Sequence, residues 1–182
     1  VSFWGSLGSG AMNRAMADFL ALESAKEPFH HIHATGSFGK EWMPKRVMDN
    51  GVDWKSCPAL DIREYIYDMP TVMAAADIVI GRAGSATCNE IGASGTPCIL
   101  IPSPNVTNNH QEKNARVLEA AGGAGVGLEK DCTPGKLYEL IRSLLADEDR
   151  RREMSRKLHT MVRLDSAERI CDIVEQLTQS EK

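Results

Sequence analysis

The sequence predicts an α/β fold with a Rossmann-like, doubly wound parallel sheet. Short runs rich in Ile and Val at residues 77–81 and 97–103 are bounded by Gly and Pro, which is typical of strands buried on both faces. Helical patterns alternate with such runs, and this alternation indicates βαβ units. The length of 182 residues and the hydrophobic content of 42% suit one domain with a substantial core.

In the first half of the chain, each apolar run is followed by a helical pattern. We expect a strand at 1–4 (VSFW), a helix at 12–26, a strand at 28–36 (PFHHIHATG), a helix at 38–51, a pair of strands at 57–67 and a short helix at 69–76. The helix at 38–51 is expected to break near Pro44, because proline inside a helix removes a hydrogen-bond donor.

The second half repeats the alternation. We expect strands at 77–81, 97–103 and 123–129, helices at 85–95 and 110–123, one or two helices at 133–162, and a last helix at 165–177. The helix at 85–95 ends at Gly95, a residue type favoured just beyond a helix C-terminus. Ligands of such sheets bind beyond the carboxyl ends of the strands, so the loops there are the candidate site.

The last helix carries a stripe of apolar side chains at three- and four-residue steps, formed by Ile170, Ile173, Val174 and Leu177. We therefore divide the chain into a domain at 1–164 and a C-terminal helix at 165–182. An isolated helix of this length is marginal in water. It can fold onto its own domain, fray, or bury the stripe against a second copy.

Composition excludes several classes of protein. The net charge of −4 argues against a nucleic-acid binder, which needs a basic surface. The five cysteines are odd in number and form no CxxC pair, which favours buried thiols in a reducing compartment over a disulfide framework. No apolar run has the length of a membrane span and no signal peptide opens the chain, so we expect a cytoplasmic location.

Two glycine loops are the strongest candidates for a ligand site. Residues 5–10 (GSLGSG) and 82–87 each lie between a predicted strand and a helix, where backbone N–H groups and the helix dipole favour a phosphate. The first loop matches neither a dinucleotide fingerprint nor a P-loop. The first loop can equally be a flexible turn, and Thr87 with Glu90 has the form of a capping box.

Other candidate residues are weaker. His31 and His33 fall on one face of a predicted strand, but no carboxylate or cysteine accompanies them at metal-ligand spacing. The acidic run 147–149 lies among arginines in a helical stretch, which favours a solvated turn. The sequence therefore predicts neither a metal site nor a cofactor.

Several motifs in order resemble one glycosyltransferase family. GSLGSGAMN, HATG, the block 65–104 (YIYDMPTVMAAADIVIGRAGSATCNEIGASGTPCILIPSP) and NNHQEKNARVLEAAG are similar to the carboxyl-terminal half of the lipid-linked GlcNAc transferases of peptidoglycan synthesis. The resemblance covers essentially the whole chain. The chain departs from the family pattern in the first loop, where Trp4, Leu7 and Ser9 replace residues of a Gly-Gly-Ser-Gln-Gly-Ala pattern.

The resemblance implies the donor half of a two-domain GT-B enzyme. Such enzymes move GlcNAc from UDP-GlcNAc to undecaprenyl-diphospho-MurNAc-pentapeptide (lipid I) with inversion, giving lipid II at the cytoplasmic face of the bacterial inner membrane. The acceptor site and the membrane-contacting patch belong to the amino-terminal domain, so no membrane contact is expected from this half. The last helix would pack on that domain.

The resemblance also implies nucleotide contacts. Ile66 would meet the uracil edge through its main chain, with Met69 packed nearby. The diphosphate would be held by Ser6 and by the segment Gly84, Ser85, Ala86 and Thr87. Glu90 would accept hydrogen bonds from the ribose hydroxyls, because a carboxylate beside a diphosphate needs neutral donors as partners.

The remaining implied contacts concern the sugar. His110 and Gln111 would contact GlcNAc hydroxyls, and Arg82 and Asn114 would support the site. Because Val1 falls inside the predicted first strand, we expect the chain to be a fragment that binds the donor without turning it over. Two alternatives stay open, namely a separate donor subunit of a two-chain GlcNAc transferase and a non-enzymatic nucleotide-sugar-binding module.

Overall fold

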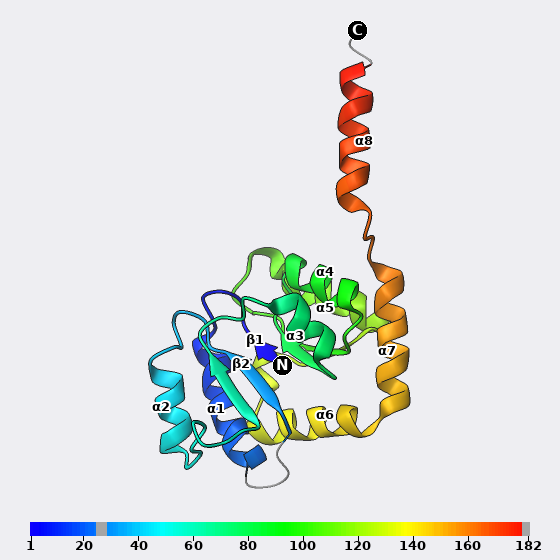
Figure 1. Ribbon diagram of the computed structural model, residues 1–182. Helices are drawn as coiled ribbons and strands as arrows, with labels where there is room; N and C mark the ends of the chain where they lie inside the picture. Colours follow the sequence, from blue (N-terminus) through cyan, green and yellow to red (C-terminus); the bar gives the residue numbers. More distant parts are fainter. Residues whose placement is uncertain (25–28, 180–182) are drawn as a thin grey trace.

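The computed structural model describes residues 1–24 and 29–179 and has one central sheet flanked by helices (Figure 1). The strands are β1 (Ser2–Phe3), β2 (His31–Ala34), β3 (Leu60–Arg63), β4 (Val79–Gly81), β5 (Cys98–Leu100) and β6 (Ala124–Val126). The α-helices are α1 (Gly10–Ser24), α2 (Trp42–Asp49), α3 (Met69–Ala75), α4 (Ser85–Ser94), α5 (His110–Ala120), α6 (Pro134–Ala146), α7 (Glu148–Met161) and α8 (Ser166–Gln179). Single 3₁₀ turns lie at Thr107–Asn109 and Glu129–Asp131.

The sheet is parallel throughout and has the order β3-β2-β1-β4-β5-β6. This is the order of a Rossmann sheet, so the predicted fold class is confirmed. In register, Phe3 pairs with Ala34 on one side and with Gly81 on the other. The chain reverses its winding between β1 and β4, and the loops that follow these two strands therefore open side by side.

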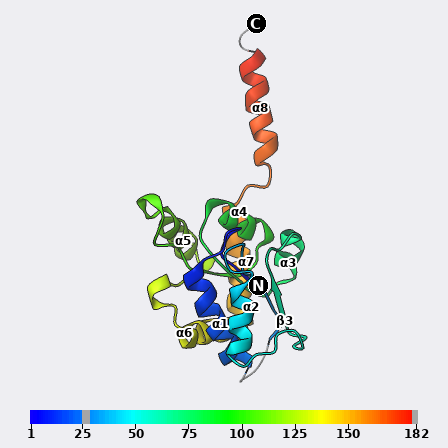
Figure 2. The same cartoon turned by 90° about the vertical axis from the view of Figure 1, so that its left-hand side faces the viewer.

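Each face of the sheet has its own hydrophobic core. One core packs α1, α2 and α6 against strand side chains on that face of the sheet, such as Ile80 and Ile99. The other joins α3, α4 and α5 to their neighbours Val79, Cys98 and Leu100. In both views α4 and α6 lie on opposite sides of the sheet (Figures 1 and 2). Alternate residues of one strand thus serve two cores, which explains the uninterrupted apolar runs in the sequence.

Two local predictions need correction, and a third is made definite by the structure. The helix α2 starts at Trp42, so Pro44 lies in its first turn, where its missing N–H is not needed and no break follows. The stretch 57–67 holds the single strand β3 and not a pair, because residues 64–68 leave the sheet to enter α3. The prediction of one or two helices at 133–162 resolves into two, α6 and α7.

Two predicted boundaries lie outside the described residues. The helix predicted at 12–26 is described as far as Ser24, and the strand predicted at 28–36 is described from Phe29 onward. The last three residues of the predicted C-terminal segment, 180–182, are also outside the description.

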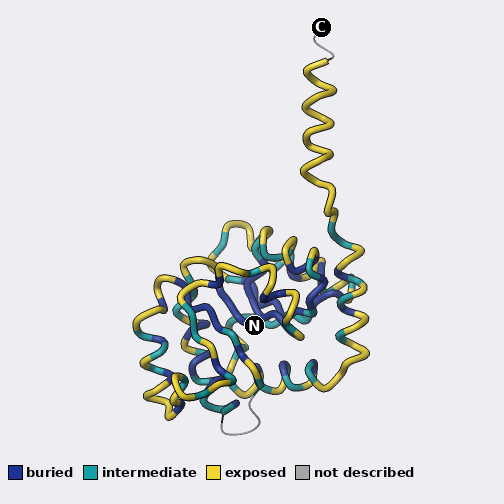
Figure 3. Tube along the Cα trace, in the orientation of Figure 1, coloured by how far each residue is buried: buried dark blue, intermediate teal, exposed yellow. Residues whose placement is uncertain are grey.

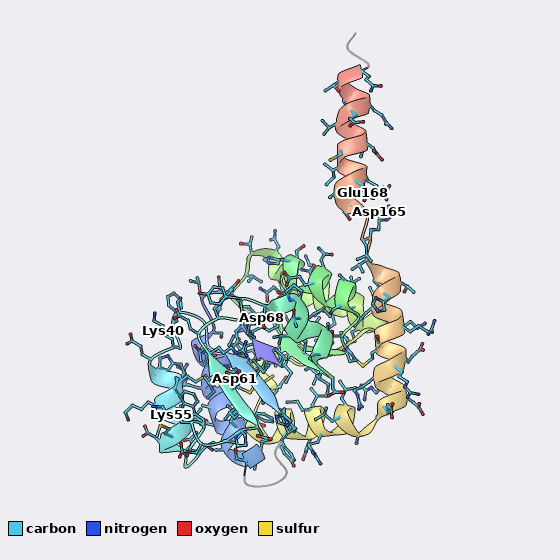
Figure 4. All side chains as sticks on the ribbon, viewed as in Figure 1. Lys40, Lys55, Asp61, Asp68, Asp165 and Glu168 are labelled. Atoms are coloured by element: carbon cyan, nitrogen blue, oxygen red, sulfur yellow. The ribbon has the colours of Figure 1, made fainter. Side chains whose placement is uncertain are left out.

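The helix α8 stands away from the rest of the chain (Figure 1). All its described residues are exposed, whereas the strands are mostly buried (Figure 3). Asp165 directly precedes this helix, and Glu168 lies in its first turn (Figure 4). The predicted apolar stripe is present, with Ile170, Ile173 and Val174 each more than half exposed. Among the residues that the structure describes, those of the domain body leave these three side chains exposed.

Candidate functional site

The two glycine loops meet at the point where the sheet reverses its winding. The loop after β1 runs through residues 5–10 into α1, and the loop after β4 runs through residues 82–84 into α4. Both helices present N-terminal N–H groups and the positive end of the helix dipole to the carboxyl edge of the sheet. Two such N-termini beside a topological switch point are the arrangement expected for binding an anion, so this edge is the candidate site.

The first loop is held by close backbone packing and is not a free turn. Gly8 has φ of +80°, and a Cβ on it would lie 2.1 Å from the carbonyl oxygen of Thr35. The backbone N–H groups of Ser37 and Phe38 donate to Ser6 and Leu7 carbonyls at 3.2 and 3.0 Å. The loop after β2 therefore fixes the loop after β1, and only glycine fits at position 8.

The second loop leads directly into helix α4. Gly84 is the N-cap of α4, and its carbonyl accepts the Cys88 N–H at 2.9 Å. Thr87 is the third residue of the helix and cannot be its N-cap, so the structure excludes the capping box of Thr87 and Glu90. Glu90 is exposed, and its side-chain carboxylate forms no hydrogen bond or ion pair with the described residues. Its carboxylate is available to a ligand.

The residues expected to read the nucleotide base lie in the loop between β3 and α3. Ile66 is 2% exposed, so its side chain anchors this loop in the core. Met69 is the first residue of α3 and packs against the same core. Ser6 and the first two residues of α4, Ser85 and Ala86, are exposed. These positions all lie on the loops that follow the carboxyl ends of the strands, or on the first residues of the helices that these loops enter.

The start of α5 brings two polar side chains to this edge. His110 is exposed, and its Nδ1 lies 3.0 Å from the Thr107 carbonyl oxygen. Gln111 accepts the backbone N–H of Ser103 at 2.9 Å through Oε1, which leaves its amide N–H₂ as a donor. Asn114 donates to the Ala83 carbonyl at 3.0 Å and so holds the approach to Gly84.

The guanidinium of Arg82 binds protein partners. The residue is 8% exposed, donates to the Ile101 carbonyl at 3.0 Å and to Ser9 Oγ at 2.8 Å, and forms an ion pair with Glu129. Its expected supporting role stays a prediction. The sequence motifs did not identify Glu129. Its place after a strand, at the same edge as the glycine loops, is the feature that could have indicated it.

A polar hollow of about 330 Å³ opens beside these groups. Its lining comes from the loops after β1, β4, β5 and β6 and includes Ser9, Ser103, Asn105, Gln111 and Glu129. Hydroxyl, amide and carboxylate groups of this kind match the hydroxyls of a sugar. The carboxyl edge thus combines an anion site with a polar hollow.

The opposite edge of the sheet is different in character. A cavity of about 460 Å³ lies at the amino ends of the strands, lined mainly by apolar side chains together with His31. Ser2 Oγ lies 2.7 Å from His31 Nε2 and 2.6 Å from His33 Nδ1, and all three residues are buried. Burial lowers the pKa of His33 to about 3 and that of His31 well below its ordinary value. Both rings are therefore neutral.

Two further findings concern ligands and membranes. Among residues 1–24 and 29–179, no three His, Cys, Asp or Glu side chains gather in a way that could hold a metal ion. Within that same part of the chain, no helix combines the length and the apolar character that crossing a bilayer requires.

Asp147 of the acidic run caps α7 by accepting the Arg150 N–H at 2.9 Å.

The fold and the site define a Rossmann-like domain of the kind found in GT-B glycosyltransferases. The chain belongs to the glycosyltransferase family 28 C-terminal domain family, whose model matches residues 3–172. The resemblance seen in the sequence is thereby confirmed.

Curated relatives match nearly the whole chain. A UDP-N-acetylglucosamine--N-acetylmuramyl-(pentapeptide) pyrophosphoryl-undecaprenol N-acetylglucosamine transferase of Acetivibrio thermocellus is 38% identical over 99% of this chain and 47% of its own length. The enzyme of the same name from Caldanaerobacter subterraneus subsp. tengcongensis is 41% identical over 98% of this chain and 48% of its own length. The chain thus spans about half the length of the curated relatives it matches.

Solved structures show the same fold. Acinetobacter baumannii MurG aligns with a TM-score of 0.77 at 24% identity, over 96% of this chain and 49% of that one. MnaA of S. aureus, solved with UDP, aligns with a TM-score of 0.71 at 12% identity, over 98% of this chain and 45% of that one.

Proposed function

We propose that this chain is the donor-binding domain of an inverting GlcNAc transferase of peptidoglycan synthesis. In this proposal the full-length enzyme uses UDP-GlcNAc to convert lipid I to lipid II. The observation that supports it best is the identity of 38–41% to two transferases of that name over nearly the whole chain. The relative MnaA, solved with UDP, supports a uridine nucleotide on this fold.

The nucleotide would lie across the carboxyl edge of the sheet. The main chain of Ile66 would bind the uracil edge, and the anchored side chain of that residue supports this role because it keeps the loop in place. Glu90 would bind the ribose hydroxyls, since its carboxylate is exposed and unpaired among the described residues. Met69 would pack beside the base.

The diphosphate would lie between the two helix N-termini. Backbone N–H groups of Gly84, Ser85, Ala86 and Thr87 would bind it from α4, and Ser6 would contact it from the loop after β1. Because helix N-termini supply the positive potential, no metal ion is required for this binding. GlcNAc would then occupy the polar hollow, where Gln111 has free amide N–H groups and His110 lies nearby.

The rest of the enzyme would supply the acceptor site. Inverting transfer requires the acceptor to be held in line with the donor, and this needs a second binding surface across a cleft. We propose that the amino-terminal domain binds lipid I and that α8 packs its exposed apolar stripe on that domain. The full-length protein would act at the cytoplasmic face of the inner membrane, with no membrane or nucleic-acid contact from this half.

Calorimetric titration of the chain tests the donor assignment. UDP and UDP-GlcNAc should bind in EDTA-containing buffer, and ADP should bind much more weakly because adenine does not match a site built for uracil. An absence of UDP binding, or binding that depends strictly on Mg²⁺, would contradict the proposal. UDP-glucose is the matched probe for the sugar, since it differs from UDP-GlcNAc at one substituent.

A further inference from the structure

One buried guanidinium joins four strand ends. Arg82 directly follows β4, and its Nη1 donates to the Ile101 carbonyl beyond β5 at 3.0 Å. Its Nη2 donates to Ser9 Oγ in the loop after β1 at 2.8 Å and to the Glu129 carboxylate in the 3₁₀ turn after β6. The guanidinium carbon also lies 5.9 Å from the centre of the Trp4 ring.

The ion pair between Arg82 and Glu129 is mostly shielded from water. The side chains are 10% and 18% exposed. A shielded guanidinium needs a counter-charge, because the loss of one partner leaves the other charge poorly solvated. Glu129 supplies that charge within the described residues, so Arg82 stays directed toward the protein even without a ligand.

The pair is linked to both anion-binding helix N-termini. Ser9 directly precedes α1, and its Oγ lies 3.5 Å from the Met12 backbone nitrogen in the first turn of that helix. Arg82 precedes the N-cap of α4, Gly84, by two residues. Holding the guanidinium in place therefore sets the position of the α1 N-terminus relative to the α4 N-terminus.

We propose that Glu129 is a positioning residue for the donor diphosphate, acting through Arg82 and Ser9. It would fix the spacing between the two helix N-termini without touching the diphosphate. This inference rests on the proposed function, because the diphosphate is the group that both helices would bind. Phosphate binding by backbone N–H groups depends on their placement, so loosening one helix start weakens the diphosphate site and leaves the base and ribose sites intact.

Glu129→Gln tests this inference when it is titrated with uridine and with UDP. We expect UDP to bind about tenfold more weakly, within the usual range for coupled neighbours, while the affinity for uridine stays within about twofold. Ser9→Ala removes only the hydroxyl link and should give a loss of the same kind. The double variant should lose little more than Glu129→Gln alone, because both changes cut one chain of contacts.

A matched control is Glu119→Gln. Glu119 pairs with Arg116 at 2.7 Å on the exposed side of α5, and its removal should change neither affinity. Should Glu129→Gln fold poorly in thermal melts, Ser9→Ala alone decides the question.

Four results would overturn the inference. Equal weakening of uridine and UDP would mean a general loss of structure, and unchanged UDP affinity would mean that the pair does not position the diphosphate. Weakening of UDP-GlcNAc with unchanged UDP would make Glu129 a direct sugar ligand. A wild-type chain that binds neither uridine nor UDP would contradict the proposed function itself, and this inference with it.

Discussion

The two edges of the sheet offer cavities of similar size and opposite character. The hollow at the carboxyl edge measures about 330 Å³ and is lined by glycine loops, helix N-termini and polar side chains. The cavity at the amino edge measures about 460 Å³, is mainly apolar, and adjoins a histidine pair held neutral by burial. Volume alone does not choose between the edges, because a further hollow of about 510 Å³, lined by Ser103, Pro104 and Glu129, also lies at the carboxyl edge. The direction of the strands selects the carboxyl edge, because only there do helix N-termini point at a ligand.

The carboxyl edge depends on glycine at position 8 more than at position 5. Both residues have positive φ, of +80° and +83°, but a Cβ at Gly8 would strike Thr35 whereas a Cβ at Gly5 would meet nothing within 4 Å. Gly8→Ala should lower the free energy of unfolding by about 3 kcal/mol or more, and Gly5→Ala by about 1 kcal/mol. Chemical denaturation measures both, and equal losses would show that the loop packing is unimportant.

The amino edge should make the domain sensitive to acid. Unfolded histidine titrates near its ordinary pKa of about 6.5, while the folded rings resist protonation, so the unfolded state binds more protons as the pH falls. Stability is full above about pH 6.5 and should fall by about 1 to 3 kcal/mol for each pH unit below it.

Substitution of one buried histidine tests this dependence of stability on pH. His33→Asn should flatten the dependence of the melting temperature on pH between about pH 6.5 and 5, whereas substitution of the exposed His110 by Asn should not. An unchanged slope in His33→Asn would show that the buried pair does not govern acid stability. Donor affinity should be unaffected by His33→Asn, since the pair lies at the opposite edge from the proposed site.

Glu90→Ala tests the carboxyl edge without disturbing the fold. Loss of charge-assisted hydrogen bonds to ribose should weaken UDP binding by about 1 to 3 kcal/mol. Because the side chain is exposed and unpaired within the described residues, the melting temperature should stay the same. Glu168→Ala, another exposed carboxylate far from the site, is the control (Figure 4). A lower melting temperature with normal UDP affinity would make Glu90 a structural residue.

The helix α8 should contribute least to either edge. Ile173→Asp should change the stability of the domain by less than about 0.5 kcal/mol, because this side chain is exposed on a helix that stands away from the described part of the body. The same change should weaken association with the amino-terminal domain in a two-fragment binding assay. Strong hydrogen-exchange protection of α8 in a monomer would contradict this, since it would place the helix on its own domain.

Apart from the second strand expected at 57–67, the sequence predicted the order and type of the elements, because their periodicities are local. It also placed both glycine loops at one edge, because parallel strands end together. It failed at Pro44, where the effect of proline depended on a helix start two residues away. It did not find the pairing of Arg82 with Glu129, because the two residues are 47 positions apart and only the sheet order brings them together.

Chemical-shift mapping by NMR tests most directly the claim that the carboxyl edge binds the donor. On addition of UDP-GlcNAc to labelled protein, the amide signals of residues 6–10, 66 and 84–87 should shift. The signals of His31, Asp77 and Ile78 at the amino-edge cavity should stay in place. Shifts confined to the amino edge, or no shifts at a saturating concentration of the nucleotide sugar, would contradict the account.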